Sequence, residues 1–343
     1  MSSEQVTGID VGNVTAWFAD HTEITEPLQF DLVAHGRSNL TFVVSDAEGR
    51  RWVLRRPPTG HVLAGAHDML REHRIMSALA ATDVPVPTMV GRCSIEAVNG
   101  APFYVMEHID GHILKKLDEM GPFDEAACRT MSESLVDTMV ALHDVDPDAV
   151  GLGTLGKKED YLARQLHVWK RQIDRGSDRE LPLLQELHTV LEQRMPPQEG
   201  AGIVHGDFRL DNCVIGDDDR VAAVLDWELC TLGDVRADLA GMIMWWGDPT
   251  GQTRAMADAP TLAPGMLTPA EVIDRYAAAS GRDLSELPYF VAFQFWRLAA
   301  ISEGVRFRFA QGAMGDKDIG DEMAGFETRI DLLLDESRRL LST

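Results

Sequence analysis

The chain has 343 residues, 45% of them hydrophobic, and single hydrophobic cores usually stop growing at roughly 250–300 residues, so two lobes are expected. The 32 Lys and Arg residues against 55 Asp and Glu residues give a net charge of −23. This acidity argues against a nucleic-acid partner and is compatible with neutral or cationic small molecules. The four cysteines have neither the CxxC spacing of a zinc site nor the density of a disulfide scaffold.

No targeting segment and no membrane span are predicted. The first residues, MSSEQVTGID, contain neither a basic cluster nor an apolar run, and no later stretch approaches ~18 uninterrupted apolar residues. We therefore expect a soluble, cytoplasmic protein without a membrane partner, and make no prediction of its oligomeric state.

Short β-rich segments and one main helix make up the first part of the chain. Val11, Val14, Trp17 and Phe18 recur at helical spacing and predict a helix before the first strand. The segments that follow predict strands at 28–33, 40–45 and 51–55, a helix at 66–79, and strands at 84–93 and 102–109. Because short turns join the first three strands, we expect an antiparallel meander. Residues 1–108 thus form the predicted β lobe.

Long helical patterns dominate the rest of the chain. They cover residues 124–143, 158–174, 183–195, 269–279, 289–311 and 321–341. A small β lobe followed by a mostly helical lobe at 109–343 predicts an α+β, bilobal protein.

The most informative stretch of the sequence interrupts these helices. It reads IVHGDFRLDNCVIGDDDRVAAVLDWE from Ile203 to Glu228, and a predicted hairpin separates its two polar clusters. The hairpin would bring Asn212 and Asp226 together on one cation with Asp207 nearby. Magnesium prefers oxygen ligands, and Asp207 would then be free to accept the proton of an attacking hydroxyl. The alternative is that these residues only cap turns.

HGDFRLDN followed by VLDWE resembles the signature of the aminoglycoside and choline phosphotransferase superfamily, whose architecture is similar to that of protein kinases. The run VLDWELCTLGDVRADLA most resembles the kinase-like domains fused to acyl-CoA dehydrogenases and their stand-alone bacterial relatives. The resemblance implies ATP and Mg²⁺ as cofactors. It assigns Asp207 as catalytic base and Asn212 and Asp226 as magnesium ligands, with Asp238 and His205 supporting the catalytic loop.

The resemblance also places the nucleotide on the β lobe. Arg55 occupies the position at which the kinase strand carries lysine, and Glu72 is its expected partner on the helix. Arginine can still bind phosphate oxygens, although a surface salt bridge is the alternative for this residue. The remaining candidate nucleotide contacts are Gly36, Ser38 and Asn39 in the loop HGRSN, and Glu107 and Ile109 at the hinge.

Candidates for the acceptor site come from the helical lobe. We expect Glu228, Trp296 and Arg297 to contact the acceptor, with Trp245 and Trp246 as further aromatic candidates. Aromatic residues at helical spacing are more often core residues, which is the alternative for each tryptophan. Arg297, Arg306 and Arg308 would suit an anionic portion of an acceptor.

The predicted activity is transfer of the γ-phosphoryl group of ATP to a hydroxyl of a small molecule. Two acceptor classes remain open, namely hydroxy acids or hydroxyacyl-CoA esters, and aminoglycosides. Two other functions also remain open. One is a pseudokinase-type nucleotide-binding regulatory module, and the other is a magnesium-dependent phosphohydrolase.

Overall fold

The computed structural model describes residues 6–34, 39–59, 68–247, 256–311 and 319–342. The chain divides into two compact units. The first unit contains Met1–His112, Val214–Asp217 and Val221–Leu229, and the second contains Ile113–Cys213, Asp218–Arg220 and Cys230–Thr343. We expected a single boundary after residue 108, with the whole polar stretch in the second lobe. By its contacts, most of the hairpin belongs to the first unit instead.

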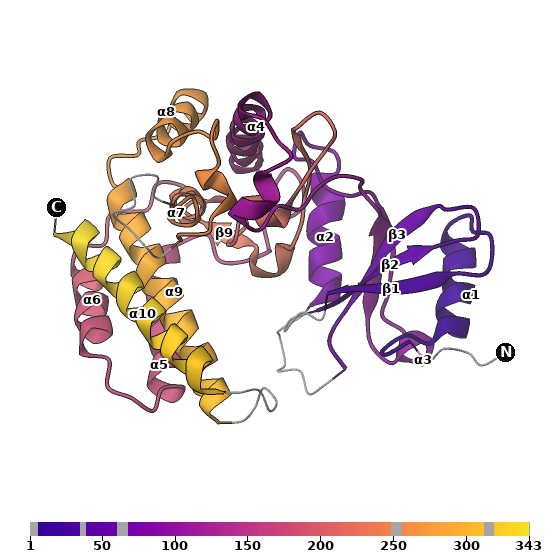
Figure 1. Ribbon diagram of the computed structural model, residues 1–343, viewed down its shortest axis with the longest axis horizontal. Coiled ribbons are helices and arrows are strands. Elements are labelled where there is room, and N and C mark those ends of the chain that lie inside the picture. Colours follow the sequence, from indigo (N-terminus) through magenta and orange to yellow (C-terminus); the bar gives the residue numbers. More distant parts are fainter. Residues whose placement is uncertain (1–5, 35–38, 60–67, 248–255, 312–318, 343) are drawn as a thin grey trace. The chain divides into compact units, whose positions relative to one another are not determined.

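The first unit is built on a five-stranded antiparallel sheet. Its strands are β1 (Gln29–Ala34), β2 (Leu40–Ser45), β3 (Arg51–Arg56), β4 (Met89–Cys93) and β5 (Phe103–Glu107), in the spatial order β1-β2-β3-β5-β4. The helix α1 (Val11–His21) lies on one face and α2 (Met69–Leu79) on the other (Figure 1). A short helix, α3 (Glu96–Asn99), precedes β5. The meander, the helix and the two further strands confirm the order expected from the sequence.

The strand expected at 84–93 is shorter in the structure. Only Met89–Cys93 pairs with β5, while residues 84–88 are not in a strand. Pro85 and Pro87 explain the difference, because proline has no N–H to donate to a sheet ladder.

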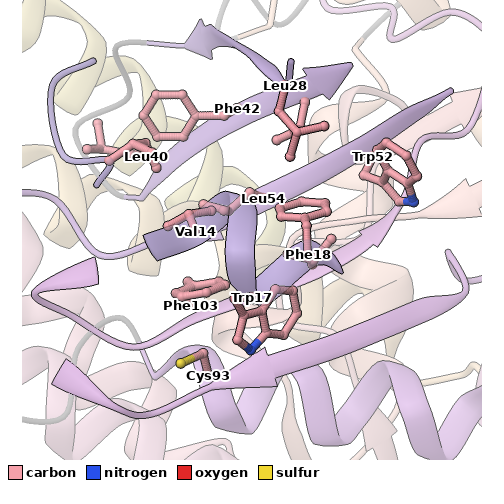
Figure 2. Packing of buried hydrophobic residues seen from close by; sticks show 13 residues of the cluster. Val14, Trp17, Phe18, Leu28, Leu40, Phe42, Trp52, Leu54, Cys93 and Phe103 are labelled. Atoms are coloured by element: carbon pink, nitrogen blue, oxygen red, sulfur yellow. The ribbon is translucent and has the colours of Figure 1, made fainter. Parts of the chain in front are cut away.

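The core of the first unit lies between α1 and the sheet (Figure 2). Trp17 packs edge-on against Phe103, with their ring centroids 5.0 Å apart. Leu54 of β3 belongs to the same apolar cluster. Successive side chains of a strand point to opposite faces, so Leu54 facing α1 directs Arg55 towards the face that carries α2.

The hairpin of β7 (Cys213–Ile215) and β8 (Val221–Val224) is present as expected. Backbone hydrogen bonds join Ile215 to His112, and the Val224 N–H donates to the carbonyl of Pro85. Gly111 has φ +149°, and a Cβ at this position would lie 2.2 Å from the Ile215 carbonyl oxygen. Glycine is therefore required where the chain passes the hairpin.

The second unit is mostly helical. Its long helices are α4 (Glu125–Asp144), α5 (Tyr161–Arg175), α6 (Pro182–Gln193), α7 (Arg236–Trp245), α8 (Pro269–Ser280), α9 (Leu287–Ala310) and α10 (Ile319–Leu341). Residues 289–297 of helix α9 are all buried, and α5, α6, α7 and α10 pack against the helix (Figure 1). Helix α7 was not among the expected helices.

A two-stranded antiparallel ribbon, β6 (Gly202–Val204) with β9 (Thr231–Gly233), leads into the polar stretch of the second unit. None of the helices in the described ranges is long and apolar enough to cross a bilayer.

Candidate functional site

The segment after β6 forms a tight loop around the Asp238 carboxylate. The backbone N–H groups of His205 and Gly206 both donate to Asp238, the second over 2.7 Å. Gly206 has φ +87°, a conformation that glycine adopts without steric cost. Asp238, on the first turn of α7, therefore holds the loop that presents Asp207.

Asp238 is itself buried, with 3% of its surface exposed. Its carboxylate also lies 3.4 Å from Nε2 of His143, whose Nδ1 lies 2.7 Å from the hydroxyl of Tyr276. Burial alone would raise the pKa of Asp238, but the hydrogen bonds and the nearby histidines hold this pKa below its ordinary value. The loop is thus held by an ionised carboxylate with several donors.

Asp207 and Asn212 lie together in the second unit. The amide nitrogen of Asn212 donates to the backbone carbonyl of Asp207 over 2.7 Å and to its Oδ2 over 2.9 Å. These bonds use the amide nitrogen, so the amide oxygen is the atom left to bind a cation. Arg209 Nε lies 3.3 Å from the Asp207 carboxylate, whose side chain is 29% exposed. Asp207 is therefore accessible and oriented by two neighbours.

Replacing Asp238 with Asn is expected to destabilise the second unit by about 1–3 kcal/mol, because an amide nitrogen would face one of the two backbone N–H donors. The pKa of Asp238 in the folded protein lies below the unfolded value of 3.8, so its stabilisation is present above that pH and is lost as the pH falls. The free energy of unfolding, measured in urea, should therefore differ between the unmodified protein and Asp238→Asn, and this difference should be smaller at low pH than at pH 7.

Asp137→Asn is the matched control for this prediction. Asp137 forms an exposed ion pair with Arg275 at 2.8 Å, and such pairs contribute at most about 1 kcal/mol. Equal destabilisation by the two variants would contradict the anchoring role of Asp238.

The first unit carries a charged cluster centred on Arg55, which is only 9% exposed. Its guanidinium lies 3.2 Å from Glu72 of α2 and 2.7 Å from the Asp226 carboxylate. Tyr104, the neighbour of Arg55 in the sheet register, donates its hydroxyl to Glu72 over 3.1 Å. The expected pair of Arg55 and Glu72 is therefore present, and it is buried rather than a surface salt bridge.

Three carboxyl groups lie around Arg55 in this cluster. Besides Glu72 and Asp226, Glu228 lies 4.0 Å from Arg55. Burial, together with the nearby charges of Asp226 and Glu228, raises the pKa of Glu72 to about 7 against the lowering effect of Arg55. An excess of carboxylate oxygens would favour a divalent cation.

Asp226 has φ +64°, in the left-handed region that non-glycine residues seldom occupy. Such conformations concentrate at functional sites. Its carboxylate is one third exposed although Arg55 binds one oxygen. The carboxylate of Asp226 in the first unit and the amide oxygen of Asn212 in the second unit are each oxygen donors of the kind that Mg²⁺ prefers. Within the described ranges, no three His, Cys, Asp or Glu side chains converge as a metal site of their own.

The other expected nucleotide contacts fall in different places. Gly36 and Ser38 lie outside the described residues. Asn39 is buried and donates its amide N–H to Glu72 over 3.3 Å. Glu107 ends β5 with its side chain exposed, and Ile109 is half-buried two residues later. Asn39 thus joins the Arg55 cluster, and its Oδ1 is buried without a hydrogen-bond partner among the described residues.

The structure corrects one expected acceptor contact. Trp296 has no exposed surface, its indole N–H donates to the Leu184 carbonyl, and its ring stacks against Phe293. It is a core residue because this part of α9, residues 289–297, is buried throughout, so it cannot line an acceptor site.

The arginines of α9 are not equivalent. Arg306 is buried and forms ion pairs with Glu303 and Asp178, so it is already neutralised and does not present a binding site for an anion. Arg297 is buried as well, and its Nη1 donates to Gln294 over 3.1 Å and more weakly to the Gly206 carbonyl over 3.4 Å. Arg297 therefore lies beside the loop that presents Asp207, whereas Arg306 is a structural residue. Glu228, the remaining expected acceptor contact, belongs to the Arg55 cluster.

The sequence did not reveal a cavity of about 760 Å³ in the second unit. Its charged lining residues are Lys115, Lys116, Arg209, Asp211, Asp258 and Arg329. Its apolar wall includes Met242, Trp245, Trp246, Met256 and Leu332. The cavity is lined by Arg209, two residues after Asp207, at one side and by residues of α10 at another. Only Trp245 and Trp246 carried a signal in the sequence, as aromatic candidates for an acceptor wall.

Comparisons with known proteins identify the family. A model of the phosphotransferase enzyme family matches residues 30–290. The chain is 37% identical over 293 residues to acyl-CoA dehydrogenase family member 10 of Mus musculus, covering 84% of this chain and 27% of that protein. It is 33% identical over 334 residues to acyl-CoA dehydrogenase family member 11 of Rattus norvegicus, covering 95% of this chain and 42% of that protein. The chain thus spans about a quarter to two fifths of the length of these curated relatives.

Solved structures agree with this match. A Ralstonia eutropha protein described as a candidate aminoglycoside phosphotransferase aligns with a TM-score of 0.81 and 31% identity over 96% of this chain and 98% of that one. Choline kinase from Cryptosporidium parvum shares the fold, with a TM-score of 0.67, 14% identity and 97% of each chain covered. The resemblance and fold class that we expected are confirmed. The chain therefore belongs to the phosphotransferase enzyme family and has the protein-kinase-like fold of its small-molecule kinases.

Proposed function

We propose that this protein transfers the γ-phosphoryl group of ATP to a hydroxyl group of a small molecule, with Mg²⁺ as the metal. The observation that carries the proposal is the accessible Asp207 carboxylate, held by Asn212 on a loop that Asp238 anchors. In the reaction the acceptor oxygen forms a bond to the γ-phosphorus, the bond to the bridging oxygen breaks, and ADP leaves. Asp207 accepts the hydroxyl proton or orients the hydroxyl for attack.

The first unit would bind the nucleotide. The Arg55 guanidinium is positioned by Glu72 and can bind phosphate oxygens, and Asn39 has a buried amide oxygen that lacks a partner among the described residues. We propose the backbone between Glu107 and Ile109 as the adenine contact, and retain Gly36 and Ser38 as phosphate contacts. Asn212 and Asp226 would hold Mg²⁺, which offsets the charge of the phosphate oxygens when it is bound.

The charge of the cavity favours an anionic acceptor. Among the described residues, four basic and two acidic side chains line it, an excess of two positive charges in a chain whose net charge is −23. A polycationic aminoglycoside would be repelled there, whereas a hydroxy acid or a hydroxyacyl-CoA ester would be attracted. We therefore propose the second class as the acceptor, with Arg297 and Glu228 as further candidate contacts.

Asp226→Ala should abolish most of the thermal stabilisation by MgATP, because the variant loses one of two proposed metal ligands. The measurement is the shift of the melting temperature on adding MgATP. Asp217→Ala, at the exposed tip of the same hairpin, should keep the full shift. An unchanged shift in Asp226→Ala would remove this residue from the metal site.

Phosphorus NMR tests the function itself. The protein is incubated with MgATP and a panel of hydroxy acids, hydroxyacyl-CoA esters, choline-like alcohols and aminoglycosides. A new phosphate ester signal with stoichiometric ADP supports the proposed kinase. Accumulation of inorganic phosphate alone would indicate a phosphohydrolase, and binding of ATP without any product would indicate a regulatory module.

A further inference from the structure

Two arginines contact the same aromatic ring in the cavity of the second unit. Trp245, the last residue of α7, has the Arg209 guanidinium 4.4 Å from its ring centroid. The Arg329 guanidinium lies 5.9 Å from the same ring. Arg329 belongs to α10, beyond the residues 30–290 that match the family model, so its position is not part of that match. The two cations reach the ring from distant parts of the chain.

Arg209 and Arg329 differ in their carboxylate partners. Arg209 lies 2.8 Å from the Asp211 carboxylate and 3.3 Å from that of Asp207. Arg329 forms no ion pair within 4.0 Å with a carboxylate among the residues that the structure describes. Partial desolvation lowers the pKa of Arg329, and the neighbouring charge of Arg209 lowers it further. The residue as a whole is exposed, so an incoming anion can reach it, and the anion would also offset the repulsion between the two guanidiniums.

We propose that Arg329 is a specificity-determining residue of this cavity, where it binds the anionic group of the acceptor while Trp245 and the apolar wall cover the acceptor's carbon skeleton. The inference rests on the proposed function, and adds the residue that selects the acceptor. A guanidinium can form paired hydrogen bonds with a carboxylate or with a phosphate group. The same two arginines disfavour an acceptor with ammonium groups.

The test compares Arg329→Gln and Arg329→Lys with the unmodified protein on three probes that share one hydroxylated chain. The probes are 3-hydroxydecanoate, its neutral amide and its coenzyme A thioester. Calorimetric binding without nucleotide and phosphate transfer with MgATP are both measured. Arg338→Gln is the matched control, because Arg338 lies on the same helix in an exposed pair with Asp335 at 2.7 Å.

Arg329→Gln should raise the Kd and KM for an anionic probe by about 10- to 100-fold, as expected for a charged hydrogen bond, and leave kcat within about twofold. Arg329→Lys should retain part of the affinity for the anionic probes. The affinity for the neutral amide should not change in any variant, and Arg338→Gln should bind all three probes as the unmodified protein does. If Arg329→Gln loses affinity for the acid, Arg329 binds the carboxylate of the acceptor. If it loses affinity for the thioester alone, Arg329 binds the phosphates of coenzyme A.

Equal losses for the acid and the amide, or no loss for any probe, would overturn the inference. Failure of both anionic probes to bind the unmodified protein would overturn it as well. Binding that depends on Arg329 without any phosphate transfer would instead contradict the proposed function and support the role of Arg329.

Discussion

Asp207→Ala should lower the rate of phosphate transfer by about 10²- to 10⁴-fold, the usual contribution of a general base. The carboxylate is the group proposed to accept the hydroxyl proton, and it also receives the amide N–H of Asn212 over 2.9 Å. Binding of MgATP should change little, because Asp207 is not a proposed metal or phosphate ligand. Steady-state kinetics with a confirmed acceptor and the thermal shift with MgATP measure the two effects separately.

The control for Asp207→Ala is Asp174→Ala. Asp174 forms an exposed pair with Lys170 on α5 and should give wild-type kinetics. Unchanged turnover in Asp207→Ala would remove the central assignment. A loss of turnover accompanied by an equal loss of the thermal shift would mean that Asp207 supports nucleotide binding instead.

Arg55→Ala should destabilise the first unit by about 3–5 kcal/mol, because it leaves buried Glu72 without its positive partner. It should also abolish the thermal shift with MgATP, because the proposed phosphate contact is lost. Arg55→Lys keeps the charge but not the paired hydrogen-bond geometry, so an intermediate shift is expected. Chemical unfolding and the MgATP melting shift are the measurements.

A double-mutant cycle separates the two roles of Arg55. Adding Glu72→Gln to Arg55→Ala should recover at least half of the lost stability, since the unpaired buried charge is then removed. It should not recover the MgATP shift. Arg51→Ala, at the exposed first residue of the same strand, should cost less than about 1 kcal/mol. Recovery of both properties in the double variant would show that Arg55 is only structural.

Local patterns predicted the fold of the first unit closely. Alternating residues and turn signals marked β1, β2 and β3, and the 3.6-residue period marked α2. The prediction was wrong where a local rule was overlooked, as at Pro85 and Pro87, which leave residues 84–88 without strand structure. Helix α7 was missed because it is buried on several sides and has no polar face to produce a periodic pattern.

Some features of the candidate site were predictable from the sequence, and others were not. Asp207, Asn212, Asp226 and Asp238 lie within 32 residues of one another, and the spacing of this motif was enough to propose their roles. The exposure of a side chain depends instead on which helices enclose it, so Trp296 was wrongly assigned to the acceptor. No sequence pattern connects Arg329 with the catalytic loop, since about 120 residues separate it from Arg209.

By itself, the sequence determined that the chain is a two-lobed α+β protein with a phosphotransferase signature, because strand alternation, helical periodicity and motif spacing are local properties of the chain. Only the tertiary structure decided how each charge is balanced. It buried Arg55 between Glu72 and Asp226, neutralised Arg306 with Glu303, and placed Arg329 against Trp245 without a described carboxylate partner. These pairings depend on helix packing between residues far apart in the chain, which no local pattern records.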